Sequence, residues 1–208
     1  MRTQVLRAAG SGTIAAALTV LRRGGLVAFP TDTVYGLGAL ADAEEAVRSI
    51  YKVKGRGAEN ALPILLHSAK ELGQLAADVP PQALWLAERF WPGPLTLILR
   101  KSPWVSGAVS SLPTVGIRVP AHPFALALLR EAGPMAVTSA NLSGGRSPST
   151  SDEVMSALGG RVDLLIDGGV APGGRASTIV DLSGEAPQVL REGPISVEEI
   201  LAALSHGA

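Results

Sequence analysis

Cations and hydroxyls, rather than nucleophiles or metal ligands, are the residues of this sequence that suit chemistry. Arg118 lies in the strand-like stretch 113–120, where alternation puts Thr114, Gly116 and Arg118 on one face and the apolar residues Val115, Ile117 and Val119 on the other. An arginine inside an apolar strand must reach water or face an anion, because a buried unpaired charge is costly. Since a guanidinium fork matches a carboxylate, we predict an anion-binding role for Arg118.

Two more cations, Lys54 and Arg56, stand at the end of a predicted helix. Cations there suit the helix dipole, which is a complete structural explanation. On a loop beside Gly55 they are also free to reach an anion, and Asn60 follows on the same loop. Both interpretations stay open for this segment.

Hydroxyl-rich loops follow two apolar runs, at 30–38 and at 139–149. Ligands bind at the carboxyl ends of strands in α/β sheets, and such loops cradle phosphate through backbone and side-chain groups. An ordinary turn explains each loop equally well by itself. The polar residues concerned are Thr33, Ser139, Asn141 and Ser147, joined by Ser177 and Arg191 at the ends of the last apolar runs.

Motifs of other chemistries are absent or misplaced. The stretch 36–41 matches the dinucleotide fingerprint G-x-G-x-x-A, but it does not directly follow the apolar run that ends at Phe29. His67, His122 and His206 lack ligand spacing, so we predict no metal held by protein side chains. What remains is a site that positions and neutralises a polyanion such as a nucleotide.

The elements that must position these residues alternate along the chain. Strand-length apolar runs occur at 26–29, 62–66, 95–99, 115–119, 135–138, 164–166, 177–182 and 188–190. Helix starts are predicted at capping boxes from Asp42, Ser68, Thr150 and Ser196, and at Pro81 and Pro123. We therefore predict one α/β domain over residues 1–208, with a twisted, open, mixed parallel and antiparallel sheet flanked by helices.

Composition excludes several classes of protein. Among 208 residues, 18 Lys+Arg balance 18 Asp+Glu, whereas proteins held on nucleic acid mainly by phosphate contacts are usually basic. The absence of cysteine removes disulfides and thiolate chemistry. No apolar run approaches the ~18 residues of a membrane span, and the run 14–21 has the spacing of an amphipathic helix. We expect a cytoplasmic protein without a membrane segment.

Taken in order, the motifs resemble those of the YrdC-like family, the threonylcarbamoyl-AMP synthases of tRNA modification. They are P-T-D-T-V-Y-G-L from Pro30, K-G-R from Lys54, R-V-P from Arg118, S-A-N-L-S-G from Ser139, S-T-I-V-D from Ser177 and R-E-G from Arg191. Each motif is weak alone, but their shared order over nearly the whole chain is specific. The resemblance implies the single-domain form of the family, with a concave, positively lined pocket.

The resemblance also implies an activity, that of a nucleotidyltransferase. L-threonine, bicarbonate and ATP, with Mg²⁺ accompanying ATP, would give threonylcarbamoyl-AMP and pyrophosphate. Partner proteins of the TsaD, TsaB and TsaE type would then pass the threonylcarbamoyl group to an adenosine beside the tRNA anticodon. Weak tRNA binding is a further expectation.

Residue by residue, the resemblance implies L-threonine binding by Thr33, Arg118 and Ser177. It implies ATP binding by Lys54, Arg56, Asn60, Thr114, Ser139, Asn141, Ser147 and Arg191. Lys54, Arg56 and Arg118 would serve catalysis by neutralising charge and positioning the reactants, without a covalent nucleophile. The chain departs from the family at Gly57 and Ala61, where proline is usual, and at Leu65, where some members have histidine.

Two other functions stay open. A non-catalytic module that binds tRNA or double-stranded RNA would show steep salt dependence and no ATP turnover; the 4% aromatic content argues against recognition by base stacking. A relative in the same superfamily with another carbamoyl acceptor would share the adenylate step but not threonine.

Overall fold

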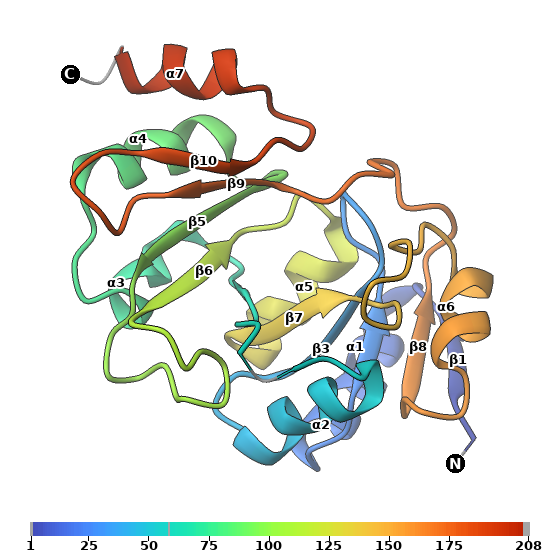
Figure 1. Cartoon of the computed structure of the whole chain (residues 1–208). Helices are drawn as coiled ribbons and strands as arrows, with labels where there is room; N and C mark the ends of the chain where they lie inside the picture. The colour runs from blue at the N-terminus through green and yellow to red at the C-terminus, as the bar shows by residue number, and fades with distance from the viewer. Residues whose placement is uncertain (1, 58, 206–208) are drawn as a thin grey trace.

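One ten-stranded sheet runs through residues 2–57 and 59–205, the part of the chain that the computed structural model describes (Figure 1). The strands are β1 Gln4–Arg7, β2 Val27–Phe29, β3 Gly36–Leu40, β4 Ile64–Leu65, β5 Leu95–Arg100, β6 Thr114–Arg118, β7 Met135–Ser139, β8 Leu164–Asp167, β9 Thr178–Asp181 and β10 Gln188–Arg191. Their spatial order is β1-β8-β2-β3-β7-β4-β6-β5-β9-β10. Parallel pairs such as β2–β8 and β4–β6 occur beside antiparallel pairs such as β3–β7 and β5–β6, which confirms the predicted mixed sheet.

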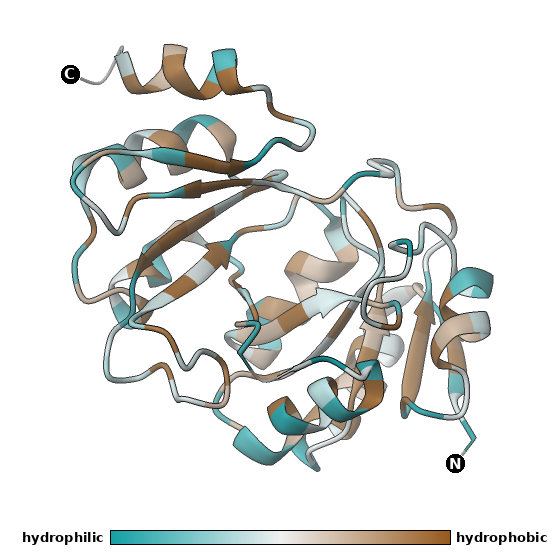
Figure 2. Cartoon of the chain, in the orientation of Figure 1, coloured by the Kyte–Doolittle hydropathy of each residue, from teal (hydrophilic) through white to brown (hydrophobic). Residues whose placement is uncertain are grey.

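Helices cover both faces of the sheet. They are α1 Gly10–Arg22, α2 Glu44–Lys54, the 3₁₀ turn η1 Ala69–Glu71, α3 Leu72–Leu75, α4 Pro81–Phe90, α5 Pro123–Ala132, α6 Ser151–Leu158 and α7 Val197–Ser205. In β2, Val27 and Phe29 pack in one core with α1 and α5, while Ala28, and Leu26 just before the strand, pack in the other. This division follows from strand alternation, because successive side chains point to opposite faces. Figure 2 shows the hydrophobic residues concentrated on the strands and on the helix sides that meet them.

The helix starts test the capping predictions individually. The boxes from Ser68 and Ser196 both form, although the first opens only the short η1–α3 segment. At α6, the Thr150 hydroxyl accepts from the Glu153 amide as predicted. The Glu153 carboxylate, however, accepts from the amide of Ser149 and not from that of Thr150. The box from Asp42 is wrong, because α2 begins after Ala43 and has no side-chain cap. Two acidic residues in the first turn of α2 provide favourable charge there without a cap.

Two strands were not predicted. β1 is an edge strand of mostly exposed residues, so it lacks the apolar run by which the other strands were recognised. β3 was not predicted because residues 30–38 were interpreted as a loop leading from a strand towards a helix. Its sequence, GLGAL, contains two glycines, which are depleted in strands. It lies instead in the middle of the sheet, paired with β2 and β7. The segment between β2 and β3 is therefore a strand-to-strand loop, not a strand-to-helix loop.

Candidate functional site

An open cavity of about 320 Å³ lies on the sheet where the predicted polar residues converge. The predicted residues that line it are Thr33, Arg56, Thr114, Arg118, Ser139, Ser147, Ser177 and Arg191. Three arginines and no carboxylate are among its lining residues within the described part of the chain. The alternation of β6 is confirmed, since Thr114, Gly116 and Arg118 all face this cavity. The cavity is therefore suited to an anionic ligand.

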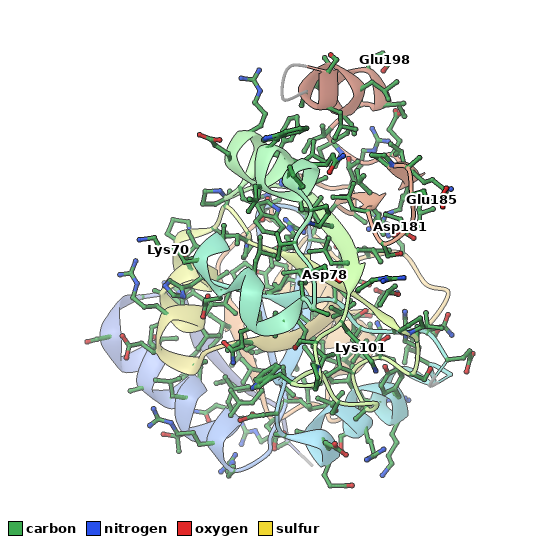
Figure 3. All side chains as sticks on the ribbon, turned by 90° about the vertical axis from the view of Figure 1, so that its left-hand side faces the viewer. Lys70, Asp78, Lys101, Asp181, Glu185 and Glu198 are labelled. Atoms are coloured by element: carbon green, nitrogen blue, oxygen red, sulfur yellow. The ribbon has the colours of Figure 1, made fainter. Side chains whose placement is uncertain are left out.

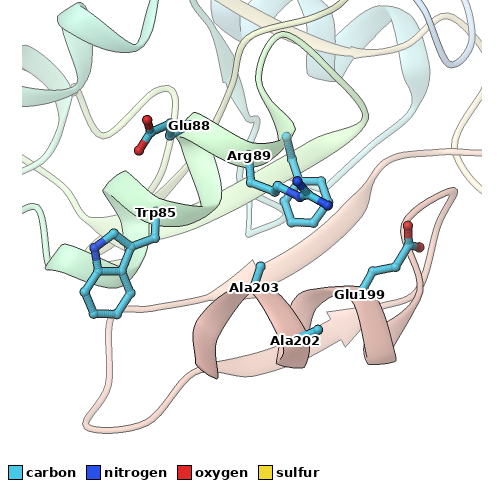
Figure 4. A pocket seen from close by; sticks show the side chains of 7 residues that line it. Trp85, Glu88, Arg89, Glu199, Ala202 and Ala203 are labelled. Carbon is cyan, nitrogen blue, oxygen red and sulfur yellow. The ribbon is translucent and has the colours of Figure 1, made fainter. Parts of the chain in front are cut away.

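Two other hollows among the described residues do not have this character. The groove between α4 and α7 is larger, about 700 Å³, and is lined by Trp85 and alanines together with Glu88, Arg89 and Glu199 (Figure 4). In this groove the Glu199 carboxylate accepts a hydrogen bond from the Ser196 amide. Hydrogen bonds with Ser196 lower the pKa of Glu199, and the charge of Arg89 adds to the effect. A third hollow, beside the β9–β10 turn, contains Asp78 and Glu185, which Figure 3 labels. With mixed or acidic charges, neither suits a polyanion.

Arg118, at the end of β6, is held from three directions. Its Nε donates to the Gly93 carbonyl at 3.0 Å, one terminal nitrogen donates to Thr33 Oγ1 at 2.9 Å, and the other donates to Asp32 Oδ1 at 2.5 Å. The residue is only 6% exposed. Burial lowers its pKa, and the nearby Arg191 adds to this, while the Asp32 carboxylate opposes it. The guanidinium is thus a fixed and partly neutralised cation at the cavity wall.

The loop between β2 and β3 is organised by hydroxyl groups. Thr31 Oγ1 donates to the Val34 carbonyl at 2.6 Å and shares a 3.0 Å hydrogen bond with Thr33 Oγ1. The amides of Thr33 and Val34 donate back to Thr31 Oγ1. Both threonines are buried and both line the cavity. This local network explains why the loop presents Thr33 to Arg118 in one orientation.

Arg191, at the end of β10, holds a second polar group of the cavity lining. Its Nε donates to the Ser177 carbonyl at 2.9 Å and a terminal nitrogen donates to Ser177 Oγ at 3.3 Å. Ser177 Oγ also shares a 2.8 Å hydrogen bond with Thr96 Oγ1 of β5. Burial lowers the pKa of Arg191. Within the described residues Arg191 has no carboxylate partner, so its charge is available to a ligand.

Arg56 reaches the cavity from the loop after α2. The last helical residue, Lys54, is followed by Gly55 as the C-cap. The φ of Gly55, 60°, is the left-handed conformation that glycine adopts without steric cost. This turn directs Arg56 away from the helix, and its guanidinium donates to the carbonyls of Asn60 and Ala61 at 3.1 and 3.3 Å. Like Arg191, Arg56 forms no ion pair with any described residue.

Lys54 is placed differently from the prediction. It is the last residue of α2 rather than a loop residue, it is 2% exposed, and it does not line the cavity. Its ammonium donates to the carbonyls of Ser139 and Asn141. Burial lowers its pKa to about 8, and the charge of Arg56 contributes. Its predicted contact with ATP stays a prediction; the observed contacts are with the backbone that carries Ser139.

Asn60 and Asn141 also lie outside the cavity lining. Asn60 is exposed, and its amide donates to the Gly57 carbonyl and to Glu59. The amide of Asn141 donates to the carbonyls of Leu142 and Gly145, at 2.7 and 2.8 Å, and so closes the loop after β7. The structure therefore brings eight of the predicted residues into one cavity and leaves Lys54, Asn60 and Asn141 beside it.

Polar residues that were not predicted as site residues include Thr31, Thr96 and Thr138, which line the cavity, and Asp32, which contacts Arg118. Thr96 interrupts the apolar run LTLIL of β5, and this interruption is the signal that it faces a cavity. Thr31 and Asp32 stand in a segment that is typical of a turn, so composition gives no signal for them. Leu65, noted as a departure from the family, lines the cavity beside Arg118, its partner in the β4–β6 register.

The histidines and acidic residues of the described chain are not grouped as metal ligands. No group of three or more His, Asp or Glu side chains there is placed to hold a metal ion. His67 is within 2.9 Å of Glu71 and His122 caps α5, whereas His206 lies outside the described residues. No described helix is long and apolar enough to cross a membrane.

Comparison with known proteins identifies this arrangement. The family profile named for Sua5, YciO and YrdC, with the description "Telomere recombination", matches residues 19–193. The chain belongs to this family. Among solved structures of the family, Sua5 of Pyrococcus abyssi complexed with L-threonine has a TM-score of 0.93 and 43% identity, over 98% of this chain and 61% of that one. YciO of Escherichia coli has a TM-score of 0.85 and 30% identity, over 96% and 98% of the two chains.

Curated members of the family are similar in sequence as well. A threonylcarbamoyl-AMP synthase of Pyrococcus abyssi is 47% identical over 182 residues, which cover 86% of this chain and 54% of that protein. The Bacillus subtilis synthase is 44% identical over 194 residues, or 92% and 56%. A putative synthase of Mycobacterium tuberculosis H37Rv is 42% identical over 198 residues, or 94% and 90%. The chain thus spans little more than half the length of the first two relatives.

Proposed function

We propose that this chain is an L-threonylcarbamoyladenylate synthase. The observation that carries the proposal is the convergence of Arg56, Arg118 and Arg191 on one cavity whose described lining contains no carboxylate. Membership of the Sua5/YciO/YrdC family, several of whose similar members are named threonylcarbamoyl-AMP synthase, supports the same activity. The substrates are L-threonine, bicarbonate and Mg²⁺-bound ATP.

L-threonine binds at Arg118 and Thr33, with Ser177 as a further contact. Arg118 is already paired with Asp32, so this wall of the cavity combines a cation with a nearby anion. A free amino acid is a zwitterion, and such a pair suits it better than a concentration of one charge. A guanidinium also has more N–H donors than the three contacts of Arg118 use. Its remaining donors are available to the threonine carboxylate.

ATP binds along the part of the cavity that holds Arg56 and Arg191. Neither arginine has a carboxylate partner among the described residues, so both retain a full charge for the phosphates. Thr114, Ser139 and Ser147 supply hydroxyl and backbone groups between them. Lys54 supports this region through the Ser139 and Asn141 carbonyls. Mg²⁺ enters with the phosphates of ATP, as part of the substrate.

The reaction needs charge neutralisation and alignment more than acid–base chemistry. The threonine amine, after loss of a proton, adds to the carbon of CO₂ and releases a second proton as the carbamate forms; when bicarbonate is the carbon source, one of its oxygens leaves as water. A carbamate oxygen then attacks the α-phosphorus of ATP, and pyrophosphate leaves with the bond's electrons. These reactants repel one another in water, and alignment in the cavity is worth ~7–11 kcal/mol of the barrier. No covalent nucleophile is required.

Later steps and the cellular setting belong to the same proposal. The threonylcarbamoyl group passes to tRNA through transferase proteins of the TsaD, TsaB and TsaE type, and the enzyme works in the cytoplasm. An anhydride of a carbamate and a phosphate is reactive towards water, so transfer must follow quickly.

The test is mass spectrometry of the purified protein with ATP, Mg²⁺, bicarbonate and L-threonine, omitting each component in turn. A threonylcarbamoyl-AMP product that needs every component is the expected result. ATP consumption without threonine would favour a relative with another acceptor. Intact fold and ATP binding without any adenylate would overturn the synthase, and RNA binding at graded salt would then be measured.

A further inference from the structure

Among the described residues, Asp32 is the one carboxylate that forms an ion pair with any of the three cavity arginines, and its partner is Arg118. Its Oδ1 accepts from Arg118 at 2.5 Å, and the side chains of Asp32 and Arg118 are only 10% and 7% exposed. Asp32 itself does not line the cavity, so it stands behind Arg118. Its second oxygen, Oδ2, is buried and accepts no hydrogen bond from a described residue.

A buried ion pair of this kind is poorly explained as a source of stability. Removing two charges from water costs about as much as their attraction returns, and apolar replacements are often equally stable. The unsatisfied Oδ2 adds to that cost. Since the Asp32–Arg118 ion pair is not explained by stability and lies beside a ligand cavity, we look for its role in the geometry of the site.

The contacts of Arg118 indicate what that role is. Gly93 and Thr33 hold two of its nitrogens, and Asp32 holds the third. Only the Asp32 contact carries a full negative charge, and the Asp32 charge counteracts the lowering of the Arg118 pKa by burial and by Arg191. Without it, a buried guanidinium would be exposed to the like charge of Arg191 with no local counter-charge.

We propose that Asp32 is a positioning residue for the amino-acid subsite. It fixes the plane of the Arg118 guanidinium so that the N–H groups not used by Asp32, Thr33 and Gly93 face the cavity. It also leaves the subsite close to neutral, so that a zwitterionic amino acid is preferred to a second polyanion. Because threonine at Arg118 belongs to the proposed function, the role of Asp32 rests on that function.

The first experiment uses Asp32→Asn, which keeps the shape and one oxygen acceptor but removes the charge. We expect the KM for L-threonine to rise by roughly ten- to a hundredfold, the effect of losing a charge-assisted hydrogen bond. We expect the KM for ATP and the kcat at saturating threonine to change less than about threefold. Threonine binding measured by calorimetry without ATP should weaken by the same factor as KM.

A double-mutant cycle shows whether Asp32 acts through Arg118. In the Arg118→Gln background, Asp32→Asn should have little further effect on threonine affinity, because the group that it positions is gone. Equal effects of Asp32→Asn in both backgrounds would overturn the proposal. Asp163→Asn is the matched control, since Asp163 also lies near an arginine, Arg23, while its other carboxylate oxygen accepts from the Leu26 amide. It should leave threonine affinity unchanged.

The remaining outcomes separate this inference from the proposed function. If Asp32→Asn lowers the thermal midpoint but leaves threonine affinity intact, Asp32 is structural only and the inference fails. If the wild-type protein binds threonine but makes no adenylate, the synthase fails while the binding assay still decides the role of Asp32. If the wild-type protein neither binds threonine nor makes adenylate, both fail.

Discussion

The ammonium of Lys54, at the end of α2, donates a hydrogen bond of 2.5 Å to the carbonyl oxygen of Ser139, at the end of β7. The same ammonium donates to the Asn141 carbonyl, and the Ser143 amide donates back to the carbonyl of Lys54 at 2.9 Å. A helix end and a strand end far apart in sequence are thereby joined beside the cavity. The loop that carries Ser139 is therefore held by a buried cation.

Replacement of Lys54 by methionine should reduce synthase activity at least tenfold while changing stability little. The variant leaves two carbonyls without a donor but also relieves the burial of a charge, so we expect the free energy of unfolding to change by less than about 2 kcal/mol. Steady-state kinetics and urea denaturation measure the two effects. Lys52→Met, on an exposed side of the same helix, is the control. Full activity of Lys54→Met would exclude a role for this lysine.

The pH dependence of stability should also report Lys54. Its pKa is lowered from 10.5 to about 8 in the folded chain, chiefly by burial. Between these values the unfolded chain holds the proton and the folded chain does not, so the contribution of Lys54 to the free energy of unfolding rises with pH. Below pH 8 the contribution is flat. We would measure the free energy of unfolding of wild type and Lys54→Met by urea denaturation from pH 7 to pH 10. Above pH 8 the wild type should gain stability relative to Lys54→Met, and a constant difference between the two would contradict the assignment.

The sheet could be predicted largely from apolar runs, because strands buried on both faces are continuous in hydrophobicity. All eight predicted runs overlap a strand, although the run Leu62–Leu66 shortens to β4. The sequence could not reveal β3, since its glycines are unfavourable in isolation and its pairing with β2 and β7 is a long-range property. Only tertiary structure shows that Gly36 faces Val137 closely enough to exclude a larger side chain.

The site was predictable where side-chain type and alternation coincide, and not elsewhere. Arg118 was identifiable because a charge in an apolar strand needs an explanation. Asp32 was not, because an aspartate in a threonine-rich turn has a sufficient local explanation. Lys54 was predicted on the loop, whereas it is the last residue of α2. This difference of one residue decides whether its side chain points into the cavity or is buried beside it.

Removal of the Tyr35 hydroxyl should loosen the loop at 168–176. The hydroxyl donates to the Gly169 carbonyl at 2.7 Å and accepts from the Gly168 amide at 3.1 Å, and burial raises its pKa. We expect Tyr35→Phe to lower the free energy of unfolding by about 0.5–1.5 kcal/mol. Limited trypsin digestion should then cut faster after the exposed Arg175. Tyr51→Phe, which removes a hydroxyl bonded to Val109, is the control and should not affect this cleavage.

A methyl group at Gly193 should disrupt the wall that carries Ser177. A Cβ there would lie 2.4 Å from the Ala176 carbonyl oxygen and 2.5 Å from the Thr178 amide nitrogen, both of them backbone atoms that cannot move independently. We expect Gly193→Ala to destabilise the fold by about 1–3 kcal/mol, the usual cost of overpacking, and to reduce activity. Gly184→Ala, where a Cβ meets nothing within 4 Å, should behave as wild type. Thermal denaturation compares the two, and equal midpoints would show that the backbone gives way.

Arg118 and Arg191 should affect different substrates when each is replaced by glutamine. Arg118 is paired with Asp32 and suits a zwitterion, whereas Arg191 is unpaired among the described residues and suits phosphate. Loss of a hydrogen bond to a charged group costs about 1.5–3 kcal/mol, so each KM should rise by roughly ten- to a hundredfold. We expect Arg118→Gln to raise the KM for threonine and Arg191→Gln to raise the KM for ATP. Initial rates with one substrate varied at saturation of the others measure both.

If Arg118→Gln instead raised the KM for ATP and Arg191→Gln that for threonine, the two substrates would bind in the opposite orientation in the cavity. Arg191 also supports Ser177, a predicted threonine contact, so Arg191→Gln needs a control that affects Ser177 alone. Ser177→Ala removes the hydroxyl shared with Thr96 and keeps the arginine. If Ser177→Ala raises only the KM for threonine while Arg191→Gln raises chiefly that for ATP, the arginine contacts phosphate directly. If the two variants give the same kinetic changes, Arg191 acts only by holding Ser177, and Arg56 is left as the cavity arginine that neutralises ATP.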